Sequence, residues 1–149
     1  MQSVALHTAS SLGILFRQVR DAMWARMAEE LERHGHDLTF SQYIALKRLA
    51  HGVAGASELA RAADLNPGAM TRLLDRLEEK GLVRRRPAAG DRRAIEVELT
   101  AEGERIWSEV NRCGARVRAL AMQGLSTQER AELTRLLERV RDNLSPSGS

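Results

Sequence analysis

Five arginines stand on either side of one turn in this sequence. They are Arg84, Arg85, Arg86, Arg92 and Arg93, and all lie within ten residues. The whole chain has a formal net charge of only +3, so this density exceeds what solubility requires. A guanidinium pairs well with phosphate and fits the narrow, electronegative minor groove of DNA. The segment therefore indicates an anionic partner.

Asp91 stands two positions before Arg93. One interpretation is that its carboxylate holds the Arg93 guanidinium extended by a forked hydrogen bond. The other is that Asp91 stabilises the turn through its own backbone, as aspartates often do. The sequence leaves both roles open.

A second basic surface is predicted on the helix that precedes the arginines. Asn66 is a good N-cap and Pro67 suits the first helical position. A stripe at Met70, Leu73, Leu74 and Leu77 faces a core. The opposite face presents the candidate DNA contacts Gly68, Ala69, Thr71, Arg72 and Arg76. A merely solvated charged face would have a similar pattern.

The helices and strands around these residues can be predicted from the spacing of apolar residues along the chain. Apolar spacing and capping signals predict helices over residues 10–33, 39–50, 57–63, 66–80, from 100 onward and 126–144. Alternation at Ile95, Val97 and Leu99 predicts a strand, with residues 82–86 as its antiparallel partner across a turn at 87–94. The arginines therefore lie on a hairpin.

Two short helices joined by a tight turn and followed by a hairpin predict a winged helix-turn-helix. The fold class expected is mainly α with a small β-hairpin wing and long N- and C-terminal dimerisation helices. Residues 39–99 form the expected DNA-binding region. Residues 1–38 and 100–144 form the helical dimerisation region, and 145–149 a disordered tail. The terminal helices carry apolar stripes that the small winged module cannot cover, which predicts a homodimer, although packing within one chain is the alternative.

The length and composition of the chain disfavour several other classes of protein. A chain of 149 residues fits one domain, and its single cysteine excludes an internal disulfide. No apolar run is long enough to span a bilayer and no secretory signal is evident, so we expect a cytoplasmic protein without a membrane partner. No catalytic motif or phosphate-binding glycine loop is present, so we expect neither an enzyme nor a cofactor.

The run LARAADLNPGAMTRLLDRLEEKGLVRRRPAAGDRRAIEVELTAEG at residues 59–103 resembles the core of the MarR family of bacterial transcription regulators. The D-x-R motif at Asp91 and Arg93 and the L-T-x-x-G ending at residues 99–103 carry this resemblance. It implies a homodimer that binds a pseudo-palindromic operator in double-stranded DNA, usually as a repressor. It also implies release by a small aromatic or phenolic ligand or by oxidation. On the wing, we expect DNA contacts from Arg84, Arg86, Asp91, Arg92 and Arg93.

In proteins of this kind the ligand lies between the dimerisation helices and the winged module. The polar or aromatic residues expected to line such a site are His7, Ser11, Phe16, Arg17, Arg20, Trp24, Tyr43 and His51. Each of these residues alone is more often structural or solvated. An arginine beside an aromatic ring would suit an aromatic carboxylate.

Three other interpretations carry less weight. The first is a winged-helix adaptor that binds proteins without affinity for DNA, which the arginines disfavour. The second is a zinc site from His34 and His36 with His51 or Cys113; the spacing is poor, and we expect no metal. The third is redox sensing at Cys113, which falls on an apolar helical stripe where cysteine usually behaves as a small hydrophobe.

Overall fold

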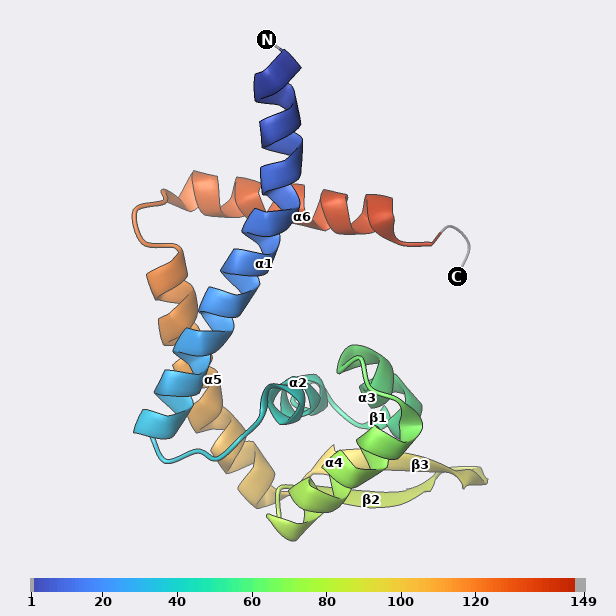
Figure 1. The fold of residues 1–149 in the computed structure, drawn as a ribbon. Helices are drawn as coiled ribbons and strands as arrows, with labels where there is room; N and C mark the ends of the chain where they lie inside the picture. The colour runs from blue at the N-terminus through green and yellow to red at the C-terminus, as the bar shows by residue number, and fades with distance from the viewer. Residues whose placement is uncertain (1, 147–149) are drawn as a thin grey trace. The chain divides into compact units, whose positions relative to one another are not determined.

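The computed structural model describes residues 2–146, with the side chains of residues 11–91 and 93–146. The chain forms two compact units that divide between Val117 and Arg118. Its elements, shown in Figure 1, are α1 (Gln2–Arg33), α2 (Phe40–Leu49), β1 (Ala54–Gly55), α3 (Ala56–Ala62), α4 (Pro67–Glu79), β2 (Val83–Ala88), β3 (Asp91–Leu99), α5 (Ala101–Ala121) and α6 (Thr127–Leu144). The predicted class, mainly helical with a small antiparallel sheet, is confirmed.

Local hydrogen bonds fix the helix starts where the sequence predicts them. The Thr39 hydroxyl accepts from the Gln42 amide at 3.2 Å, and the Gln42 side chain accepts from the Thr39 amide at 3.1 Å. Ser126 and Glu129 form the same reciprocal box at α6. Asn66 caps α4 by accepting from the Ala69 amide at 2.8 Å. Helix α1, however, begins at residue 2 rather than 10, because no glycine or proline interrupts the preceding residues.

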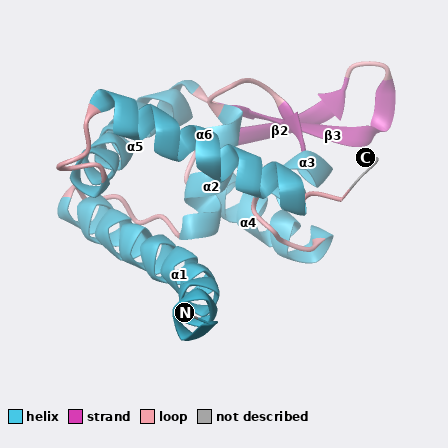
Figure 2. Cartoon of the chain, turned by 90° about the horizontal axis from the view of Figure 1, so that it is seen from above, coloured by secondary structure: helices cyan, strands magenta, loops and turns pink. Residues whose placement is uncertain are grey.

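The hairpin is longer than predicted. Strands β2 and β3 pair antiparallel from Val83 opposite Leu99 to Ala88 opposite Asp91, which leaves only residues 89 and 90 between them (Figure 2). A register irregularity follows Pro87. Strand β1 was not predicted from the sequence; its two residues pair with β3 to give the order β1-β3-β2. Two residues are too few to produce a period-two signal.

Two groups of buried side chains hold the first unit together. One lies in the winged module and centres on Leu46, Leu59, Leu74 and Leu77. The other joins the C-terminal half of α1 to α5, and its members are Met27, Leu31, Tyr43, Val110, Cys113 and Val117. Apolar burial of this kind contributes about 25 cal/mol per Å². Through this second group, α1 and α5 are packed against α2 of the winged module.

The start of α5 is fixed tightly to the strand that leads into the wing. A Cβ at Gly103 would lie 1.9 Å from the Leu82 carbonyl oxygen, so only glycine permits this approach. The Thr100 amide donates to the same oxygen at 3.0 Å, and the Thr100 hydroxyl donates to the Gly81 carbonyl at 2.5 Å. The L-T-x-x-G run thus has a packing role between α5 and β2.

The segment between α1 and α2 contacts both α5 and α4. The His36 side chain, only 7% exposed, lies 3.2 Å from the Glu109 carboxylate of α5. The Lys80 ammonium at the end of α4 donates to the Asp37 carbonyl. This segment therefore connects the long helices to the end of α4.

Apolar stripes remain exposed in both units. On α1 the stripe is buried at Met27 and Leu31 but exposed further toward the N-terminus at Leu12, Phe16 and Val19. Helix α6 buries none of its residues, and its Leu136 and Leu137 are 45% and 42% exposed. None of the helices in the described residues is long and apolar enough to cross a membrane.

Candidate nucleic-acid interface

Helix α4 has one buried and one exposed face, as predicted. Met70, Leu73, Leu74 and Leu77 are buried in the winged module. The candidate contacts Gly68, Thr71, Arg72 and Arg76 are exposed, and Ala69 is half-buried. Among the side chains that the structure describes, no acidic partner lies within ion-pair distance of Arg72 or Arg76. Both cations therefore remain available to an external anion.

The first turn of α4 is suited to close approach. A Cβ at Gly68 would meet only the Asn66 side chain at 3.5 Å and the Arg72 side chain at 3.6 Å, which is ordinary contact. The fold itself therefore does not require glycine there. The Thr71 hydroxyl donates to the Pro67 carbonyl at 2.9 Å, so its oxygen can still accept a hydrogen bond from outside. The positive end of the helix dipole also lies at this turn.

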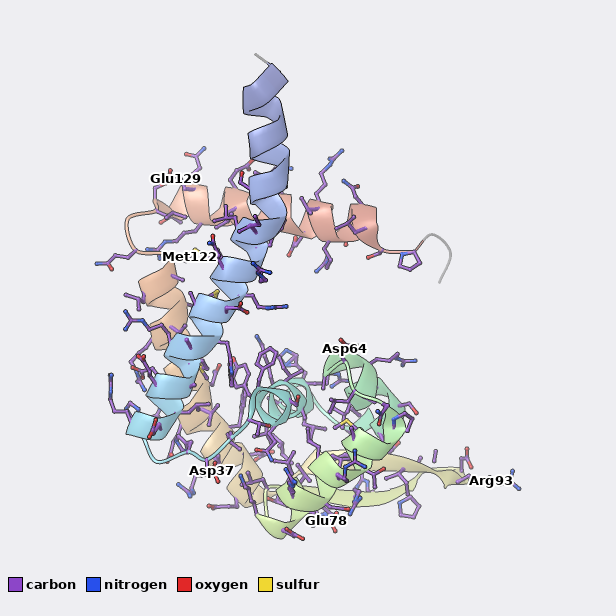
Figure 3. All side chains as sticks on the ribbon, viewed as in Figure 1. Asp37, Asp64, Glu78, Arg93, Met122 and Glu129 are labelled. Atoms are coloured by element: carbon purple, nitrogen blue, oxygen red, sulfur yellow. The ribbon has the colours of Figure 1, made fainter. Side chains whose placement is uncertain are left out.

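Arg93 lies at the tip of the hairpin and points away from the rest of the winged module (Figure 3). The expected fork between Asp91 and the Arg93 guanidinium is absent from the described contacts. Instead, the Asp91 carboxylate accepts from the Arg93 backbone amide at 3.0 Å. Asp91 therefore shapes the backbone at the tip, which was the second role considered for it, because its carboxylate is satisfied locally. The side chain of Arg92 lies outside those that the structure describes.

Arg84 and Arg86 lie opposite acids of the neighbouring strand. Strand alternation places both on the same face as Glu96 and Glu98. Arg84 contacts Glu98 at 3.0 Å, and Arg86 lies 3.4 Å from Glu98 and 3.7 Å from Glu96. Their charges are partly neutralised within the wing. Arg93, in contrast, has no carboxylate within ion-pair distance among the described side chains, so it is the stronger candidate contact.

Arg85 has a role that the sequence analysis missed. Its guanidinium contacts Asp75 at 2.6 Å and Glu78 at 2.8 Å, and both acids lie on α4. Arg85 donates both hydrogen bonds, and the one to Glu78, followed by the one to Asp75, raises the pKa of its guanidinium. The period-two pattern of β2 places Arg85 on the face opposite Arg84 and Arg86, and this pattern could have indicated its contact with α4. Arg85 connects the wing to α4.

Four aromatic side chains form a cluster at the junction of α1, α2 and α5. The ring centroids of Trp24 and Phe40 are 4.7 Å apart, those of Trp24 and Tyr43 are 6.4 Å apart, and those of Tyr43 and Trp107 are 5.7 Å apart. The Lys47 ammonium lies 6.0 Å from the Tyr43 ring centroid. Trp24 and Tyr43 were expected from the sequence, whereas Phe40 and Trp107 were not. Phe40 and Trp107 lie near the starts of α2 and α5, and this position in the sequence could have identified them as members of the cluster.

The other proposed effector residues are not brought into this cluster by any described ring contact. Ser11, Phe16 and Arg17 lie on exposed parts of α1, and His51 is exposed after α2. Arg20 is exposed and contacts its neighbour Asp21 at 3.1 Å. The His7 side chain lies outside the described side chains.

Cys113 is 1% exposed and belongs to the group of buried residues between α1 and α5. Burial raises the pKa of its thiol, which is the opposite of what a reactive thiolate needs. Of the histidines considered for zinc, His34 lies close to Cys113, whereas His36 contacts Glu109. His34, His36, His51 and Cys113 therefore do not form one group among the described side chains.

An exposed α4 face with two arginines that lack acidic partners, a hairpin with an arginine at its tip, and the helices α1 and α5 packed on this module define a winged helix-turn-helix DNA-binding protein. The MarR family model matches residues 38–95. Over 87% of this chain and 96% of the other, the apo form of MarR from E. coli is 30% identical, with a TM-score of 0.73. The chain belongs to the MarR family of transcriptional regulators.

Three further solved structures are similar to this chain, and two of them contain a bound partner. A mutant of E. coli MarR complexed with operator DNA is 30% identical over 87% of this chain and 92% of that one, with a TM-score of 0.74. NadR in complex with 4-hydroxyphenylacetate is 27% identical over 87% and 91%, with a TM-score of 0.75. A MarR family protein from Bacillus stearothermophilus is 28% identical over 94% and 97%, with a TM-score of 0.78.

Proposed function

We propose that this regulator is a homodimeric repressor that binds a pseudo-palindromic operator and is released by a small aromatic or phenolic effector. The observation that carries the DNA-binding part is the contrast among the arginines. Arg72, Arg76 and Arg93 have no acidic partner in the described side chains, whereas Arg84, Arg85 and Arg86 are paired within the fold. The three without a partner lie on the recognition helix α4 and at the wing tip, the two elements that enter the grooves in this fold.

The dimer is supported by the uncovered stripes of α1 and α6. Leu12, Val19 and Leu136 are each close to half exposed, which is costly for large apolar side chains in contact with water. A second copy offers the same stripes and gives a closed two-fold interface. We therefore assign residues 1–38 and 100–144 to the dimerisation region and 39–99 to DNA binding. Residues 147–149 of the expected tail lie outside the described residues.

The effector site is proposed at the aromatic cluster of Trp24, Phe40, Tyr43 and Trp107. Phe40 is 46% exposed, so the cluster offers an open aromatic face rather than a closed core. NadR is a family member whose structure contains an aromatic acid. A ligand ring would stack on these side chains, and Lys47 lies close enough to Tyr43 to pair with a carboxylate.

Selection of bound duplexes from a random DNA library tests the function directly. We expect an enriched inverted repeat whose half-site centres lie about one helical turn apart, roughly 10 base pairs. Failure to enrich any sequence, by a folded dimer, would favour the alternative of a winged-helix adaptor that binds proteins without DNA affinity.

The effector is tested on the same complex with 4-hydroxyphenylacetate as the probe and cyclohexylacetate as the matched non-aromatic acid. We expect the aromatic acid to quench tryptophan fluorescence and to release DNA, and the Trp24→Leu variant to lose both responses. Equal responses to the two acids would reject the aromatic class while leaving DNA binding intact.

A further inference from the structure

Three potential metal ligands lie together where α1 packs on α5. They are Glu30 and His34, one helical turn apart at the end of α1, and Cys113 on α5. One ligand atom from each lies within 4.8 Å of the others. The Glu30 side chain is only 16% exposed and Cys113 is buried, whereas His34 is 42% exposed. This group is therefore partly enclosed but open to solvent on one side.

The Arg116 guanidinium contacts all three groups. Its Nε lies 2.7 Å from Glu30 Oε2. Its Nη2 lies 3.2 Å from His34 Nε2 and 3.3 Å from Cys113 Sγ. A carboxylate, an imidazole and a thiol thus converge on one cationic group. The same three kinds of group are also ligands of metal cations.

The tautomer of His34 is fixed by these contacts. A guanidinium can only donate hydrogen bonds, so Nε2 must accept and the ring proton must lie on Nδ1. Nδ1 is 2.9 Å from the Glu30 carbonyl oxygen, to which it donates. A histidine that binds a metal through one nitrogen commonly donates from the other to a backbone carbonyl. His34 therefore presents an unprotonated Nε2 to the Arg116 guanidinium, which also contacts Glu30 and Cys113.

We propose that Glu30, His34 and Cys113 bind a divalent transition-metal ion of the Zn²⁺ type, and that the Arg116 guanidinium takes the place of this ion in the metal-free protein. Mixed oxygen, nitrogen and sulfur ligation is typical of zinc, and a water molecule would complete the four-coordinate shell. Arg116 is 46% exposed, so its side chain can turn into solvent when the ion enters. Cys113 then binds as thiolate and its proton passes to solvent.

From the sequence we expected no metal, whereas the proposed site binds one. The spacing between residues 34 and 113 gave no local motif, because the ligands come from two helices that are far apart in the chain. The competing interpretation is a structural ion pair in which Arg116 only holds α1 to α5. The metal site and the structural ion pair predict different effects of removing Arg116 on metal affinity.

Titration of the reduced full-length protein with Co²⁺ alone tests the proposal without DNA. We expect saturable thiolate-to-Co²⁺ charge-transfer absorption, which Zn²⁺ displaces and Cys113→Ser abolishes. Glu30→Gln and His34→Gln should each weaken Co²⁺ binding about tenfold or more. Arg116→Gln should strengthen it about two- to fivefold, since a competing exposed ion pair is removed.

His51→Gln is the matched control, because His51 is an exposed histidine outside the group. Its affinity for Co²⁺ should equal that of the wild type, and circular dichroism melts confirm that each variant is folded. Absence of the charge-transfer band in the wild type would overturn the proposal. So would equal affinities of His34→Gln and His51→Gln, or weaker binding by Arg116→Gln, which would leave only the structural ion pair.

Discussion

The position of an arginine on its strand decides its role in this protein. Arg93 stands at the wing tip without a carboxylate partner in the described side chains, whereas Arg84, nine residues earlier, contacts Glu98 at 3.0 Å. The sequence predicted the basic cluster and singled out Arg93 beside Asp91, but it did not show which arginines are paired within the fold. Separating them required the strand register, which places Arg84 and Arg86 opposite Glu98 and Glu96.

The first prediction compares two arginines of the wing. Arg93→Ala should weaken operator binding about tenfold or more, since each half-site loses a contact of about 1 kcal/mol. Arg84→Ala removes the same formal charge but should cost less, because its guanidinium is already paired with Glu98. Fluorescence anisotropy on the selected duplex measures both. Equal losses would mean that only the total charge of the wing matters.

The second prediction concerns Asp91, whose carboxylate accepts from the Arg93 amide at 3.0 Å. Asp91→Asn keeps this acceptor and removes an anion near phosphate, so its affinity for DNA should equal or exceed that of the wild type. Asp91→Ala loses the acceptor and should bind more weakly. If Asp91→Asn were as weak as Asp91→Ala, the carboxylate charge itself would be required, as the forked arrangement predicts.

The third prediction concerns Gly103. Gly103→Ala should lower the free energy of unfolding by about 1–3 kcal/mol, because its Cβ would overlap the Leu82 carbonyl at 1.9 Å. Gly13→Ala is the matched control in an exposed part of α1, where a Cβ meets nothing within 4 Å. It should stabilise the protein by up to about 1 kcal/mol. Urea unfolding measures both; a neutral Gly103→Ala would contradict the packing at this contact.

At the scale of elements, local chemistry made most boundaries predictable. The capping boxes at Thr39 and Ser126 and the Asn66 cap all lie where the sequence placed them, since each involves residues three apart. Strand β1 was not predictable, because two residues pair with β3 only after the chain has folded. The Arg85 contacts with α4 were missed for the same reason: they join separate elements.

The fourth prediction tests whether Arg85 positions the wing against α4. Replacing both of its partners, Asp75→Asn with Glu78→Gln, frees a cation and removes two anions near DNA. Simple electrostatics then predicts tighter binding. If the contacts at 2.6 and 2.8 Å align the two DNA-binding elements, the preference for operator over random DNA should fall instead. Competition binding decides between them; a higher preference would show that Arg85 does not position the wing.

At the scale of the whole molecule, the uncovered stripes are as informative as the core. The sequence predicted apolar faces on the terminal helices, and α6 indeed buries none of its residues in the single chain. One sequence does not show what covers these faces; we propose that a second copy of the chain does. The aromatic cluster was predicted only in part, since Trp107 reaches Tyr43 through the packing of α5 on α2.

If the dimer binds DNA through the cations of α4 and the wing tip, its affinity for the operator must fall steeply as the salt concentration rises. Each phosphate neutralised on B-DNA contributes about −0.9 to the slope of log K against log salt concentration. Two recognition helices and two wings should contact about six phosphates or more, which gives a slope of roughly −5 or steeper. A nearly flat response from a folded dimer would show that these cations do not contact the phosphates of DNA.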